Sequence, residues 1–163
     1  EFRRVLFRSR VLPTEMSAPT GTEAQKTEAK IAKEAGAQVV FSEADQDILL
    51  RIAMAEAEGE DVEGKALVMC VVLNRVYSNG FPNTIEAVVT EPGQFSPVSD
   101  GRFYSAVPND DCKEAMQLLY DFWDESQGAT YFIRKPADGS STWHSTHLQE
   151  LFTHGNHTFY KEF

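Results

Sequence analysis

Glu56 lies where an amphipathic helix should carry an apolar side chain. Leu49, Ile52 and Ala53 recur at helical spacing, and Glu56 falls on the same face. Carboxylates are rarely buried unless a partner neutralises them or their burial serves a purpose. A buried carboxyl group keeps its proton at higher pH than a solvated one and can donate it to a reacting atom. The spacing therefore makes Glu56 a candidate general acid.

A purely structural role is the alternative for Glu56, as a carboxylate paired with Arg51 or Arg75. A solvated glutamic acid has a pKa of about 4.3, and raising it to about 6 requires about 2.3 kcal/mol of desolvation. An apolar helical face can supply that much. Periodicity alone leaves both interpretations open.

The elements that position Glu56 are predicted to be mostly helical, within one domain over residues 41–163. Ser42 is a good N-cap for the helix that carries Glu56, and Gly59 is a common terminator. Three further helices follow from apolar periodicity and capping residues: 65–77, 84–89 and 108–123. The first of these is apolar all round, which is typical of a buried helix. Residues 91–101, rich in Pro and Gly, are expected to form a loop without regular structure.

The pattern changes after Gly128. Residues 129–133 are rich in side chains that favour strands, and residues 148–152 and 157–160 flank a turn at Gly155-Asn156. Helices followed by a hairpin predict a predominantly helical α+β domain with a small antiparallel sheet in its C-terminal part.

Composition narrows the class of protein. The formal net charge is −10 and the pI is about 4.8, which argues against nucleic acid as a partner because phosphate contacts need clustered Lys and Arg. No apolar run reaches the length of a membrane span, and no export signal is visible. Two cysteines are too few for a disulfide framework, and Cys70 is expected to be a buried hydrophobic residue.

The N-terminal 40 residues differ from the rest in composition. Residues 1–40 are polar and lack an apolar stripe, so we expect a disordered or loosely helical tail. Residues 1–9 resemble translated vector or adapter sequence and are set aside.

Short motifs in a fixed order carry a family resemblance. They are Glu56-Ala-Glu-Gly-Glu60, Glu63-Gly64, Val71-Val-Leu-Asn-Arg-Val76, Phe81-Pro82, Gln94-Phe-Ser-Pro97 and Gly155-x-His157-x-Phe159. With them the chain resembles the cell-wall hydrolase family of spore cortex-lytic enzymes, the SleB/CwlJ type, over residues 45–160. The resemblance implies a lysozyme-like, mostly helical fold and a lytic transglycosylase that cleaves peptidoglycan strands.

The resemblance also implies that Glu56 is the catalytic glutamate. The chain departs from the family pattern at Ala55, where glycine is common, and at Glu58, where arginine is common. These departures leave the acid in place and change the charge around it. Glu58 lies two residues further along the helix and is expected to point into solvent.

Seven further residues are candidates for substrate binding: Glu60, Asn74, Gln94, Phe95, Ser96, Tyr131 and His157. Gln94 and Ser96 could bond an acetamido group or stabilise their own loop. Tyr131 and Phe95, and with them Phe132 and Trp143, could stack on sugars or pack in the core. Asn74 could bind substrate or cap its helix. Glu60 could be a second carboxylate or a helix cap, and His157 could line the groove or support the sheet.

Four function hypotheses follow. The first is a lytic transglycosylase that cleaves between N-acetylmuramic acid and N-acetylglucosamine, with Glu56 as general acid and then base and an anhydromuramic product. If Glu60 or Asp61 lies opposite Glu56, hydrolysis by water becomes an alternative. The pairs His144/His147 and His154/His157 raise a zinc-dependent amidase, although the His-Glu-x-x-His signature is missing. The last alternative is a wall-binding module without catalysis.

The remaining expectations concern context. We expect no cofactor and no metal, peptidoglycan glycan strands as the partner, and a monomer. The intact protein is expected in the cell wall, in the spore or outside the cell.

Overall fold

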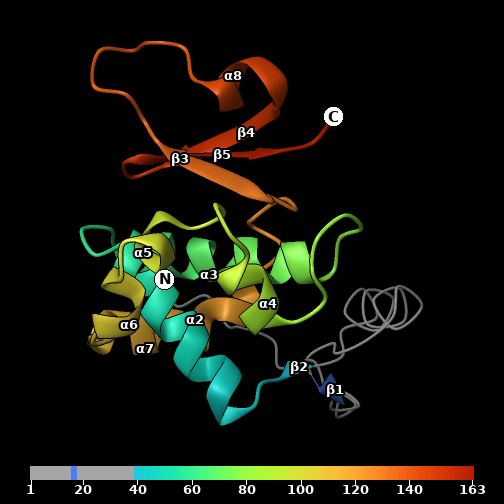
Figure 1. Cartoon of the computed structure of the whole chain (residues 1–163), viewed down its shortest axis with the longest axis vertical. Helices are drawn as coiled ribbons and strands as arrows, with labels where there is room; N and C mark the ends of the chain where they lie inside the picture. The colour runs from blue at the N-terminus through green and yellow to red at the C-terminus, as the bar shows by residue number, and fades with distance from the viewer. Residues whose placement is uncertain (1–15, 18–38) are drawn as a thin grey trace, which may run out of the picture.

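A layer of helices and a small antiparallel sheet make up the part of the chain that the structure describes. The structure is a computed structural model, and it describes residues 16–17 and 39–163. The strands are β1 (Met16–Ser17), β2 (Val39–Val40), β3 (Tyr131–Arg134), β4 (Gln149–His154) and β5 (His157–Lys161). The helices are α2 (Glu43–Glu56), α3 (Val62–Val76), α4 (Ile85–Thr90), α5 (Ser96–Ser99), α6 (Arg102–Ser105), α7 (Asp110–Phe122) and α8 (Trp143–His147). Figure 1 shows the sheet and α8 at one end of the molecule and the other helices at the opposite end.

Helix α3 is the centre of the core, as its apolar sequence predicts. Every residue from Gly64 to Val76 is buried, and the helix packs against α2, α4 and α7. Asp61 caps its start by accepting a hydrogen bond from the Gly64 N–H at 2.8 Å. Cys70 is fully buried, as expected.

Helix α2 begins and ends close to its predicted bounds. Ser42 caps it through the N–H of Asp45, and Leu49, Ile52 and Ala53 are buried on its inner face. The helix ends at Glu56, three residues before Gly59. Lys65, fully buried on α3, donates from Nζ to the backbone carbonyls of Glu58 and Glu60. These bonds hold the chain that follows the acid against α3.

The sheet has the order β3-β5-β4 with antiparallel neighbours. The predicted hairpin is confirmed, with Gly155 and Asn156 as its turn and Gly155 at φ +53°. Phe159 of β5 packs on Leu67 and Val71 of α3, which joins the sheet to the helical layer. The expected predominantly helical α+β fold is therefore confirmed.

Three features differ from the predictions or fall outside them. The loop over 91–101 contains α5, which begins with Ser96 and accommodates Pro97 in its first turn, where proline costs no hydrogen bond. Helices α6 and α8 were not predicted; a capping box between Thr142 and Ser145 stabilises the start of α8. The predicted tail over residues 1–40 lies almost entirely outside the described residues. The described strands β1 and β2 form a short parallel pair.

None of the helices in the described ranges has both the length and the apolar character that crossing a bilayer demands.

Candidate active site

One cavity of about 650 Å³ lies between the helical layer and the sheet. Its walls come from the end of α2, the end of α3, the segment around α5, strand β3, helix α8 and the β4–β5 turn. The size is typical of a site for a ligand of a few rings. Glu56 lines this cavity together with five of the seven residues predicted to bind substrate.

Glu56 is the group best suited to donate a proton in this cavity. Burial raises its pKa from 4.5 to about 7, and the charge of Asp100 adds to the rise. The cations Arg102 and Arg75 act in the opposite direction and do not cancel the effect of burial. A carboxyl group with this pKa is protonated in half of the molecules near neutral pH, where a solvated one is ionised.

A purely structural role would pair the Glu56 carboxylate with Arg51 or Arg75, and no such ion pair is present among the described residues. Arg51 pairs with Asp47 at 2.7 Å and donates to the carbonyl of Ala106. Arg102 pairs with Asp100 at 2.9 Å. Arg75 donates to the carbonyl of Thr130. None of these three arginines forms a salt bridge with Glu56 within the described part of the chain, so the carboxyl group stays available to the cavity.

Arg75 is a buried cation at the floor of the site. Only 4% of the residue is exposed, and its Nε donates to the carbonyl of Thr130 at 2.7 Å. The guanidinium lies 4.9 to 5.4 Å from the ring centres of Phe81, Phe95 and Tyr131. Cation–π contacts of this kind offset part of the cost of burying the charge. Arg75 therefore places a fixed positive charge close to the acid.

Glu60 lines the cavity but is engaged with the hairpin. Its side chain is only 6% exposed, and its carboxylate accepts hydrogen bonds from the backbone N–H of Asn156 and, at 2.8 Å, from the Asn156 amide. An added Cβ at Gly155 would overlap that carboxylate, so glycine is required for the approach. Glu60 thus fixes the β4–β5 turn as one wall of the cavity.

The structure brings Gln94, Ser96, Tyr131 and His157 to the same cavity as Glu56. Gln94 and Ser96 are exposed at its edge. The Tyr131 hydroxyl donates to Glu162 at 3.1 Å while its ring faces Arg75. Burial lowers the pKa of His157, and its Nδ1 is buried without a hydrogen-bond partner, 3.9 Å from a Glu60 oxygen. His157 is therefore a neutral imidazole in the cavity wall.

Asn74 and Phe95 lie outside the cavity lining. The Asn74 amide donates to Ser126 and to the carbonyl of Ala129, and its oxygen accepts from the Trp123 indole at 2.8 Å. These bonds satisfy the side chain within the core. Phe95 is 2% exposed and packs beneath Arg75. Both residues stabilise the fold behind the site.

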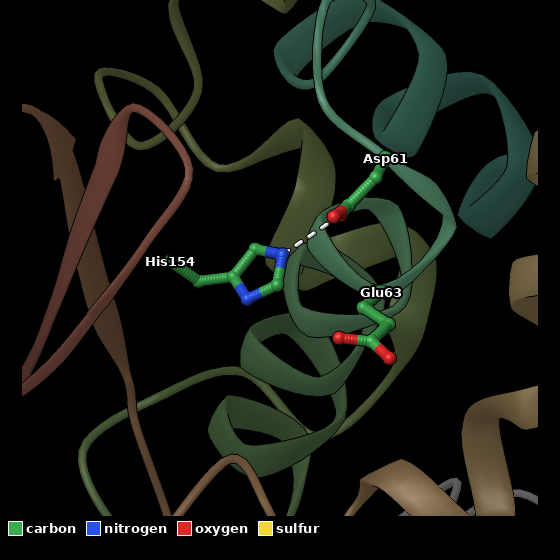
Figure 2. Close-up of side chains that lie close together, drawn as sticks. All are labelled: Asp61, Glu63 and His154. Atoms are coloured by element: carbon green, nitrogen blue, oxygen red, sulfur yellow. Dashed lines mark hydrogen bonds and ion pairs between the residues drawn. The ribbon is translucent and has the colours of Figure 1, made fainter.

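Only one set of side chains in the described residues has the types and proximity to hold a metal ion. Asp61, Glu63 and His154 place one ligand atom each within 4.8 Å of one another. Figure 2 shows His154 reaching from the hairpin to Asp61, with Nε2 donating to Oδ1 at 2.7 Å. None of the three lines the cavity, and His144, His147 and His157 are not part of the set. The four histidines thus do not converge on Glu56 as a zinc ligand set.

Several cavity residues were not predicted. Arg102, Arg134 and Asn156 line it, the first two as arginines in an acidic chain. The sequence signal for Arg75 was a charged residue at the end of an apolar helix, which indicated a partner for Glu56 and not a cavity wall. The lining combines one proton donor with three arginines, which suits a substrate that carries acceptor oxygens and carboxylates.

Comparisons with known proteins identify the family of the chain. A family model described as "Cell Wall Hydrolase" matches residues 59–160. A spore cortex-lytic enzyme of Bacillus subtilis (strain 168) is 36% identical over 124 residues, which is 76% of this chain and 39% of that protein. The chain thus spans less than half the length of that relative. The cell wall hydrolase CwlJ of the same organism is 29% identical, over 77% of this chain and 90% of that protein.

Two solved structures are similar as well. The catalytic domain of the germination-specific lytic transglycosylase SleB from Bacillus anthracis has a TM-score of 0.63 and 32% identity, over 74% of this chain and 96% of that one. The catalytic domain of the Bacillus cereus SleB protein has a TM-score of 0.64 and 31% identity, over 75% and 93%. By its sequence and by its fold, the chain belongs to the cell wall hydrolase family.

Proposed function

We propose that this chain is a lytic transglycosylase domain that cleaves peptidoglycan strands between N-acetylmuramic acid and N-acetylglucosamine. The observation that carries the proposal is Glu56, a carboxyl group with a pKa of about 7 in a cavity wide enough for sugar rings. The similarity to a solved lytic transglycosylase domain supports the same reaction.

Glu56 acts twice in this mechanism. Its carboxyl proton moves to the glycosidic oxygen, the bond from that oxygen to C1 of the muramic sugar breaks, and the N-acetylglucosamine end leaves as an alcohol. The Glu56 carboxylate then removes the proton from the C6 hydroxyl of the same muramic sugar. The freed oxygen bonds to C1 and closes a 1,6-anhydro ring. No water is consumed, and Glu56 ends the cycle protonated.

The state of Glu60 supports intramolecular attack over hydrolysis. A water-activating base needs a carboxylate free to accept a proton. Both oxygens of Glu60 accept hydrogen bonds from Asn156, and Asp61 does not line the cavity. A muramidase that hydrolyses with water is therefore the second candidate.

Product analysis and one matched pair of variants test the proposal. Glu56→Gln should lower the release of soluble fragments by about 10²–10⁴-fold, the usual contribution of a general acid, while Glu58→Gln, an exposed neighbour, keeps its activity. Mass spectrometry of the products should find anhydromuramic ends. Reducing muramic ends would assign hydrolysis instead, and full activity of Glu56→Gln would remove Glu56 as the acid.

Two other hypotheses have separate tests. A zinc-dependent amidase would lose activity with a chelator and release peptides, whereas we expect clearing of peptidoglycan to continue in EDTA and only glycan bonds to be cut. A wall-binding module would sediment with purified peptidoglycan without clearing it. The position of Asp61, Glu63 and His154 outside the cavity supports the first expectation.

The setting of the reaction is also proposed. The similar spore cortex-lytic enzymes support action on the wall of a spore or cell, outside the cytoplasm. The three arginines of the cavity suit the carboxylates of peptidoglycan, and the acidic surface does not suit nucleic acid. We propose that the domain acts as a monomer, which sedimentation velocity would test.

A further inference from the structure

A row of aromatic rings leads from the floor of the cavity to its rim. Tyr131, beside Arg75, lies 6.3 Å from His144 between ring centres, and His144 lies 5.6 Å from Trp143. All three rings line the cavity that holds Glu56. The row therefore continues the site outward along β3 and α8.

Trp143 is far more exposed to solvent than the aromatic residues of the core. It is 57% exposed, whereas Phe95, Phe159 and Trp123 are at most 3% exposed. An exposed indole leaves a large apolar surface in contact with water, and such surfaces are typical of binding sites. Of the exposed large hydrophobic residues among those described, Trp143 is the one that lines the cavity.

The indole of Trp143 is held in a fixed orientation. It stacks on His147, with ring centres 4.9 Å apart and an angle of 9° between the planes. A ring nitrogen of His147 is 3.0 Å from the Trp143 carbonyl, and the Thr142–Ser145 capping box stabilises the start of α8. A ring that is already ordered loses little conformational entropy when a ligand covers it.

His144 keeps the row uncharged between its two ends. Burial and the charge of Arg75 lower the pKa of His144, so its imidazole is neutral near pH 7. The path from Arg75 to Trp143 therefore offers ring surfaces and not additional charge.

We propose that Trp143 is a stacking platform for a sugar of the bound glycan strand that lies beyond the bond being cleaved. The proposal rests on the proposed function for its ligand. A glycan strand is a polymer, so sugars beyond the cleaved bond must lie on the surface next to the cavity. Sugar rings present a face of C–H groups that packs on an indole as other apolar groups do. Because Trp143 lines the cavity that holds Glu56, a strand that leaves the cavity on this side passes over it.

Binding measured without catalysis tests the platform. In the Glu56→Gln background, soluble peptidoglycan strands of four, six and eight sugars are titrated by calorimetry against the protein with and without Trp143→Ala. We expect the Kd for the longest strands to rise about tenfold, or about 1.4 kcal/mol, and the Kd for the shortest strand to stay within about twofold. Trp143→Phe should retain most of the affinity.

The matched control is Tyr104→Ala, an aromatic residue 64% exposed outside the cavity, which should leave every Kd unchanged. Equal losses for short and long strands, no loss at all, or an equal loss in Tyr104→Ala would overturn the proposal. A wild-type dimer in sedimentation velocity that Trp143→Ala dissociates would also overturn it, because the ring would then be a contact between copies. These binding outcomes do not depend on product structure or on turnover. Failure of the transglycosylase assignment would appear in the product analysis and not in these Kd values.

Discussion

Replacing Glu56 with glutamine should stabilise the protein, and more strongly at high pH than at low pH. Burial raises the pKa of the folded carboxyl from 4.5 to about 7, so between these values the folded state binds more protons than the unfolded state. Stability is lost as pH rises through this window. Glutamine cannot ionise and does not carry this cost.

The magnitude follows from the difference in pKa. A difference of about 2.5 corresponds to at most about 3.4 kcal/mol when the group is fully ionised in both states. Glu56 is half-buried and partly screened by water, so we expect about 1–2 kcal/mol of relative stabilisation of Glu56→Gln between about pH 5 and about pH 8.

Urea unfolding of the wild type and of Glu56→Gln at both pH values measures the effect. Glu58→Gln serves as the control, because Glu58 is exposed and should show no such difference. Equal stability changes at the two pH values would refute the argument that ionisation of Glu56 destabilises the folded state. The raised pKa, and with it the main support for the acid, would then be wrong.

Three other predictions concern the surroundings of the acid. Arg102→Met removes the cation that most lowers the pKa of Glu56, so the decline of kcat/KM above neutral pH should move to higher pH; a shift to lower pH would contradict this. Asn74→Ala leaves buried partners unpaired and should cost about 2–4 kcal/mol in urea unfolding while KM stays unchanged; a raised KM at full stability would restore Asn74 as a substrate contact. Gly155→Ala should displace the Glu60 carboxylate, lower stability by about 1–3 kcal/mol and reduce activity at least about tenfold, as measured by unfolding and by turbidity loss of wall suspensions. Normal activity of this variant would mean that the turn is not a rigid wall.

Local sequence was sufficient where a feature depends on a few neighbouring residues. The placement of Glu56 on an apolar helical face, the cap at Ser42 and the Gly155-Asn156 turn all follow from spacings of a few positions. The burial of α3 follows from its own composition. These features set the fold class and the candidate acid.

Features that depend on distant residues could not be predicted. The bond between Glu60 and Asn156 joins positions 96 residues apart, and the rings around Arg75 come from three separate segments. No periodicity reports such a contact. Asn74 shows the same limit, since a polar residue at the end of a buried helix has equal reason to face the substrate or the core.

Glu60 and Asp61 hold the same hairpin from adjacent positions, only four and five residues after the acid. This arrangement limits which kinds of mutation the segment can accept. Substitutions in the stretch between Glu56 and Glu60 keep both contacts in register with Asn156 and His154, whereas an inserted or deleted residue would shift both at once. We therefore expect this stretch to tolerate changes of residue type, as at Glu58, far better than changes of length. Loop grafting on this scaffold should begin elsewhere, for example in the turn before α8.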